Sequence, residues 1–198
     1  MQLDCRSHPN AGAQETTVDD LERTAQMPDT PLSPDEHAKQ SAETLAAVKR
    51  MEAGLAANAN DMETHFHEDF VWRGNQGCGT KPSLEAFRQN WQLPFRAMFT
   101  DRDYKTERFL ADGEWASCFG YIEATHSGTF MGIPATGKRV RIPYMDFWHV
   151  KDGRIADNPV SVDFASVMAQ LGVDVFGGEG WEAFDTGDKK PPMPETVE

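Results

Sequence analysis

Residues 139–162 have the sequence RVRIPYMDFWHVKDGRIADNPVSV, and this stretch decides the fold class. Its first half alternates apolar and other side chains with a period of two, which is typical of a strand. Asp152 and Gly153 then mark a tight hairpin turn, and a second extended run follows. We therefore predict a pair of antiparallel strands at 139–150 and 154–162.

The sequence on either side of this hairpin predicts further strands and helices. Periods of two predict strands, and apolar side chains at three- and four-residue steps predict helices. The helix that Ser83 begins is expected to break or kink at Pro94. The other predicted helices lie at 36–58, 62–67 and 164–171, and the other extended runs at 70–72, 104–110 and 115–125. Helices followed by a meander of four antiparallel strands indicate an α+β fold, with helices on one sheet face.

The charge of the chain excludes several classes of partner. Its 198 residues include 32 acids and 19 Lys and Arg, giving a net charge of -13. Such a surface repels phosphate backbones, so no nucleic acid is expected as a partner. No apolar run approaches the roughly 20 residues that span a bilayer, so no membrane association is expected. The first residues lack the pattern of a secretory signal and the three cysteines are scattered, which favours a cytoplasmic protein.

Composition divides the chain into three parts. Residues 1–35 contain no aromatic side chain and more acids than bases, so we predict a flexible acidic arm. Residues 185–198 are rich in proline and are predicted to form a flexible tail. The packed domain is then 36–184. Its last part, 173–184, is too apolar for a free tail and is expected to dock over a pocket or across a partner copy.

Asp146 is the most informative single residue of the predicted hairpin. It is the only charge among the even-numbered side chains of its strand, which form the more apolar face. A carboxylate among aromatic side chains loses hydration and has a raised pKa, as a general acid or base requires. The alternative is a structural role, in which Asp146 meets an arginine or backbone donors.

Several motifs resemble one known family. They are THSGTFMGIPATGK at 125–138, DGRI at 152–155 and QLG at 170–172. Together with HEDFVWRG and SLEAFRQNWQLPFRAMF upstream, they resemble the SnoaL-like polyketide cyclase branch of the nuclear transport factor 2-like superfamily. The resemblance implies a cone, in which a curved antiparallel sheet wraps around N-terminal helices and encloses a deep apolar pocket. It also implies homodimers and ring closure by proton transfer without a cofactor.

The polar residues of the family site do not carry over directly. The resemblance places the family's catalytic aspartate at Val160, a pocket histidine at Asp146 and a pocket asparagine at Trp72. We therefore expect a different arrangement, with Asp146 as the base and Asn158, which shares strand parity with Val160, as a hydrogen-bond donor. The expected walls of the pocket are Trp72, Trp91, Tyr144 and Trp148.

Three histidines require separate interpretation. His126 lies in the glycine-rich stretch and is expected either to bind substrate at the pocket mouth or to dock its loop. His65 and His67 lie beside acids, but two residues that are two positions apart do not share a helix face. No metal site is therefore expected there. Phosphate-binding glycine motifs are also absent from the sequence, so no cofactor is expected.

The sequence leaves two main functions open. The first is a cofactor-free enzyme of the cyclase, isomerase or hydratase type that acts on a small apolar carbonyl compound. The second is a protein that binds or carries a small molecule without chemistry, which the valine at position 160 favours. A structural dimerisation module is a third reading, which a fully packed interior would favour.

Overall fold

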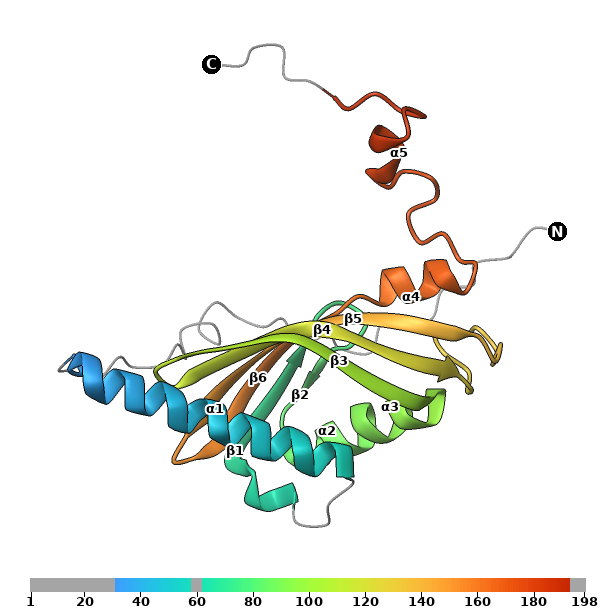
Figure 1. Cartoon of the computed structure of the whole chain (residues 1–198). Coiled ribbons are helices and arrows are strands. Elements are labelled where there is room, and N and C mark those ends of the chain that lie inside the picture. The colour runs from blue at the N-terminus through green and yellow to red at the C-terminus, as the bar shows by residue number, and fades with distance from the viewer. Residues whose placement is uncertain (1–30, 58–61, 193–198) are drawn as a thin grey trace, which may run out of the picture. The chain divides into compact units, whose positions relative to one another are not determined.

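A six-stranded sheet forms the body of the unit that runs from Pro34 to Glu198 (Figure 1). The computed structural model describes residues 31–57 and 62–192. Neighbouring strands follow the order β2-β1-β6-β5-β4-β3. Their bounds are β1 (Phe66–Gly74), β2 (Thr80–Lys81), β3 (Phe99–Asp112), β4 (Trp115–His126), β5 (Arg139–Lys151) and β6 (Arg154–Val162).

The predicted meander of four antiparallel strands is confirmed as β3 to β6, but the whole sheet is mixed. β1 pairs antiparallel with β2 and parallel with β6. Tight turns join β3 to β4 and β5 to β6 and force antiparallel pairing there, whereas helices and four strands separate β1 from β6, so a parallel arrangement is open to them. Bulges in β3 and between His149 and Val150 bend the strands. The sheet is curved and its edges do not close into a barrel.

One face of this sheet is covered by α1 (Pro34–Ala57), α2 (Leu84–Phe87), the π-helical turn η3 (Arg88–Gln92) and α3 (Leu93–Met98) (Figure 1). The 3-10 turn η2 (Met62–Thr64) precedes β1. The helix α4 (Phe164–Gln170) follows β6 and contacts β5, and α5 (Glu182–Asp185) lies away from the sheet. The long helix α1 contacts β3, β4, β5 and β6. Two hydrogen bonds fix its N-terminal half to the β3–β4 turn: Thr44 Oγ1 donates to the Gly113 carbonyl at 2.8 Å, and the Gly113 amide donates to Ser41 Oγ at 2.9 Å.

The regular helix at 84–98 is interrupted just before Pro94, where a break or kink is predicted, and continues beyond it. A π-helical turn precedes the proline, and the Leu93 amide bonds to the Arg88 carbonyl five residues back. This wider turn accommodates a proline that donates no hydrogen bond, so the helix continues to Met98. The predicted N-cap is confirmed, because the Ala86 amide donates to Ser83 Oγ at 3.2 Å.

The alternation predicted for β5 is confirmed. Its even-numbered side chains are buried against the helices, except Asp146, which keeps partial access to the interior space. The odd-numbered Met145 and Phe147 are exposed on the opposite face. Strand parity therefore turns the single carboxyl of this face towards α1.

The helix predicted at 62–67 is wrong for its second half. Only Met62–Thr64 forms a helical turn, and β1 starts at Phe66 and includes His67. The helical argument against a metal at His65 and His67 therefore does not apply. Within 31–57 and 62–192, no group of three His, Cys, Asp or Glu side chains is placed to hold a metal ion.

The ends of the chain are described only in part. Residues 1–30 of the predicted arm and 193–198 of the predicted tail lie outside the described residues. The helix α1 starts at Pro34, slightly before the predicted domain boundary. Near the C-terminus, Trp181 is 80% exposed and packs against Phe184 at 6.0 Å between ring centroids. This chain alone does not cover Trp181, so docking of 173–184 stays a prediction.

In the part of the chain that the structure describes, no helix is both long enough and apolar enough to span a membrane.

Candidate functional site

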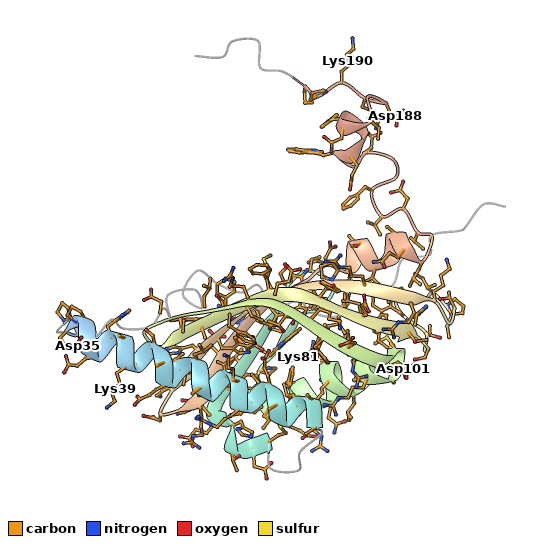
Figure 2. The ribbon with its side chains drawn as sticks, viewed as in Figure 1. Asp35, Lys39, Lys81, Asp101, Asp188 and Lys190 are labelled. Carbon is orange, nitrogen blue, oxygen red and sulfur yellow. The ribbon has the colours of Figure 1, made fainter. Side chains whose placement is uncertain are left out.

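A cavity of about 380 Å³ lies between α1, the α2–η3–α3 segment and the covered face of the sheet. Side chains from these elements fill the space between the ribbons, while Asp35 and Lys39 lie at the N-terminal end of α1 (Figure 2). Apolar groups make up most of the wall, and the polar groups come from a few positions. Those polar residues are Lys49, Glu52, Gln92, Arg96, Tyr104, Thr106, Tyr144, Asp146 and Asn158.

Aromatic side chains form one wall of the cavity. Trp91 lies 4.5 Å from Trp72 and stacks on Phe95 at 5.4 Å, measured between ring centroids. Phe164 of α4 packs against Trp91 from the other side. The four predicted wall residues, Trp72, Trp91, Tyr144 and Trp148, all line the cavity. Large rigid rings on several elements make this wall suited to a flat apolar molecule.

Asp146 and Asn158 meet in the cavity, as the sequence predicted for their placement. Asn158 Nδ2 donates to Asp146 Oδ1 at 3.2 Å and to the Phe147 carbonyl at 2.8 Å. Asn158 is 7% exposed, so these two bonds fix its amide. No arginine pairs with Asp146 in the described part of the chain, so the structural alternative of an arginine partner is not supported. The side-chain partner of Asp146 is the neutral amide of Asn158.

The environment of Asp146 raises the pKa of its carboxyl. Burial raises the pKa of this carboxyl to about 7, against the smaller opposing effect of the Asn158 hydrogen bond. In an apolar surrounding the charged form loses hydration that one amide donor replaces only in part. Asp146 therefore exchanges its proton near neutral pH.

Glu52 is the functional candidate that sequence reasoning missed. It lies on α1 and lines the same cavity. Burial raises its pKa to about 7, and the negative charge of Asp146 adds to the rise while Lys49 opposes it. The available signal was its spacing, because Val48, Met51, Glu52 and Leu55 occupy i, i+3, i+4 and i+7 of one helical stripe. An acid in such a stripe faces the core.

The two carboxyls interact and favour a state that holds one proton. Two like charges in one apolar cavity repel each other, so ionisation of one group disfavours ionisation of the other. Asp146 accepts a hydrogen bond from Asn158, which stabilises its anion. We therefore assign the charge to Asp146 and the proton to Glu52 at neutral pH.

Two further groups beside this pair, the Tyr144 phenol and the Cys118 thiol, stay neutral. Burial raises the pKa of the Tyr144 phenol, and its oxygen lies 2.7 Å from Thr106 Oγ1. Burial and the charge of Asp146 also raise the pKa of the Cys118 thiol. A thiol held in its protonated form is a poor nucleophile. These groups therefore contribute shape and hydrogen bonds to the site.

The structure places His126 away from the cavity, so a direct contact with a molecule in the cavity is not supported. His126 is fully buried at the end of β4, beside Phe99 and Phe130. Its Nδ1 lies 3.0 Å from Thr136 Oγ1, in the connection to β5. The second expectation, that this histidine docks its loop, fits these contacts.

A family model gives the class of this protein. The model of the SnoaL-like polyketide cyclases matches residues 45–171, which is more than half of the chain. The chain belongs to this family, as its motifs had indicated. Proteins of a polyketide cyclase family bind small molecules, and the cavity lies within the matched residues.

Solved structures share the fold at low sequence identity. A candidate SnoaL-like polyketide cyclase from Jannaschia sp. CCS1 is 14% identical, with a TM-score of 0.59 over 71% of this chain and 95% of that one. IdmH from Streptomyces antibioticus, a candidate polyketide cyclase, is 24% identical, with a TM-score of 0.56 over 68% and 99%. A nuclear transport factor 2-like protein from Burkholderia xenovorans LB400 is 15% identical, with a TM-score of 0.55 over 65% and 95%. The comparison with curated proteins gives no match.

The carboxyl pair predicts how stability depends on pH. Both pKa values lie above those of the unfolded chain, which are about 4. Between about pH 4 and pH 7 the folded chain therefore holds protons that the unfolded chain releases, and the contribution of the pair to stability falls as pH rises. Replacing Asp146 by Asn removes one of these groups. We expect Asp146→Asn to be more stable than the wild type at pH 8 by about 1 to 3 kcal/mol, and to show little difference at pH 4.

Urea unfolding of both proteins across this pH range measures the difference. Glu68→Gln, an acid-to-amide change at an exposed position of β1, is the matched control and should show no such trend. A difference between Asp146→Asn and the wild type that stays constant from pH 4 to pH 8 would contradict the assignment.

Proposed function

We propose that the protein is a cofactor-free acid/base enzyme that transfers protons on a small apolar carbonyl compound. The observation that carries this proposal is the pair of Asp146 and Glu52, two carboxyls with pKa values of about 7 in one cavity. A group with a pKa near the working pH is the most effective general acid or base. One charged and one protonated carboxyl in a shared site supply both functions.

Each residue of the pair has its own role in the proposed step. The Asp146 carboxylate takes a proton from the carbon next to the carbonyl, and the electron pair of the broken C–H bond moves into an enol. Glu52 gives its proton to the carbonyl oxygen, so no separated enolate charge forms. In a cyclisation the enol carbon attacks a second carbonyl within the molecule, the enol O–H proton returns to Glu52 as the first C=O re-forms, and Asp146 gives its proton to the new alkoxide. In an isomerisation Asp146 gives its proton to a different carbon of the enol system, and Glu52 recovers the enol proton.

The position of Val160 supports this assignment of the base. Val160 is the position at which the resemblance expects a catalytic aspartate, and β6 pairs it directly with Asp146 of β5. Residues that face each other across two strands have Cβ atoms roughly 5 Å apart. A carboxyl at 146 therefore reaches nearly the same part of the cavity from the neighbouring strand.

The test is conversion of a metabolite extract, followed by mass spectrometry. We expect the wild type to consume at least one apolar carbonyl compound, and Asp146→Asn and Glu52→Gln to reduce its conversion at least about a hundredfold, the usual size of a general acid/base contribution. Glu68→Gln should convert it as the wild type does. Equal conversion by Asp146→Asn and the wild type would contradict the proposal.

Non-catalytic binding is the second candidate, and the same experiment separates it. The observation that favours it is Val160, which places an apolar side chain in the cavity wall. A compound that the protein retains unchanged, equally well in the wild type and both carboxyl variants, would identify a binding protein.

We also propose that two copies associate through the outer face of the sheet. Leu110, Phe119, Met145 and Phe147 are exposed there, and the strand register places Phe119 beside Met145. Leu110 and Phe147 both pair with Ser117, from β3 and β5. An apolar patch shared by three strands is typical of an interface. A second copy would cover it.

A charge in this patch should separate the copies. We expect the wild type to have the mass of a dimer in light scattering after size exclusion, and Phe147→Glu to have the mass of one chain, because the buried charge would lack a partner. Met131→Glu, at an exposed loop position, is the matched control and should leave the dimer intact. A wild type that is monomeric at all concentrations would overturn this proposal.

A further inference from the structure

Arg96 is a cation in the cavity wall without an acidic partner. It lies on α3, is partly buried and lines the cavity together with Gln92 and Tyr104. Across the described ranges 31–57 and 62–192, no Asp or Glu oxygen lies within ion-pair distance of its guanidinium. A partly buried charge of this kind is costly unless another group compensates it.

The surroundings of Arg96 add positive charge. Burial lowers the pKa of its guanidinium, and the charges of Arg102 and Arg88 lower it further, while Tyr104 opposes the effect. Two further arginines, which do not line the cavity, thus add positive charge around Arg96 in a chain with a net charge of -13. Because salt screens charges beyond about 8 Å, this local group rather than the net charge decides what binds here.

The Arg96 guanidinium donates one hydrogen bond to the described part of the chain. Its Nη2 donates to the Leu55 carbonyl at 2.9 Å, near the end of α1. A guanidinium has five N–H donors, and this contact uses one. The planar fork of the remaining donors matches a carboxylate, which accepts two parallel hydrogen bonds.

We infer that Arg96 binds an acidic group of the ligand, so that the substrate is an apolar carbonyl compound that also carries a carboxylate. This inference rests on the proposed function for the position of the reacting carbonyl, but the anion site itself does not require catalysis. The aromatic wall of Trp72, Trp91 and Phe95 holds the apolar body. Arg96 holds the acidic end, and the carboxyl pair faces the carbonyl.

The helix α1 connects these two ends. Leu55, whose carbonyl accepts the Arg96 hydrogen bond, comes three residues after Glu52. With a rise of 1.5 Å per residue, the two positions differ by about 4.5 Å along the helix axis.

Two fluorescent probes with the same aromatic body test this anion site without any substrate. Anilinonaphthalene sulfonate carries an anionic group, and phenylnaphthylamine lacks it. We expect the wild type to bind the anionic probe more tightly, and Arg96→Gln to weaken its binding about tenfold while changing that of the neutral probe less than about twofold. Arg96→Lys keeps the charge but loses the planar fork of donors, so its affinity for the anionic probe should lie between those of the wild type and Arg96→Gln. Arg154→Gln, at the exposed start of β6, removes the same charge and should match the wild type.

The alternative role of Arg96 is purely structural, as a donor to the end of α1. In that case Arg96→Gln would lower the thermal stability and weaken both probes equally, and the inference would be overturned. Failure of the anionic probe to bind the wild type would also overturn it. If Arg96→Gln does not fold, binding of both probes to the wild type is measured with added NaCl instead. Salt should weaken the binding of the anionic probe only.

The probe experiment and the conversion experiment fail independently. Loss of anion preference in Arg96→Gln without any conversion by the wild type would support the anion site and contradict the enzyme. Conversion that depends on Asp146, without any anion preference, would support the enzyme and contradict the anion site.

Discussion

The repulsion between two carboxyls in one apolar cavity is the interaction on which this account depends. Asp146 on β5 and Glu52 on α1 come from elements far apart in sequence, and packing of α1 on the sheet brings them to a common space. No basic partner in the described chain stabilises both carboxyls as anions. Lys49 lowers the pKa of Glu52, but this effect is smaller than the rise that burial causes. The folded chain thus keeps an acid and a base in a mixed protonation state. Such a state costs stability near neutral pH, and sites that perform chemistry commonly carry this cost.

The rest of the site supports this pair by fixing its geometry. Strands β5 and β6 hold Asp146 and Asn158 through their ladder, and Asn158 is further fixed by the Phe147 carbonyl. The π-helical turn before Pro94 lets one continuous segment present Trp91 and Arg96 to the same cavity. Rigid elements rather than loops therefore carry the polar groups, which favours a defined orientation of a bound molecule.

Local patterns in the sequence predicted the features that depend on short-range interactions. The hairpin at Asp152-Gly153, the parity of β5 and the meeting of Asp146 with Asn158 all follow from the period of two and a tight turn. The parallel pairing of β1 with β6 depends on contacts between distant segments, which no local pattern carries. Glu52 is not predicted because the helical stripe at 36–58 is defined by its apolar residues alone. The sequence left two roles open for His126, because no local pattern shows where a cavity ends.

Carbon NMR of the side-chain carboxyls tests the central claim most directly. In protein labelled at the Asp and Glu carboxyl carbons, the signals of Asp146 and Glu52, assigned with the two amide variants, are followed from pH 3 to pH 9. The account predicts that both titrate near pH 7, and that the Glu52 midpoint falls in Asp146→Asn because a neighbouring charge is gone. Two independent titrations near pH 4, unchanged by either substitution, would contradict it.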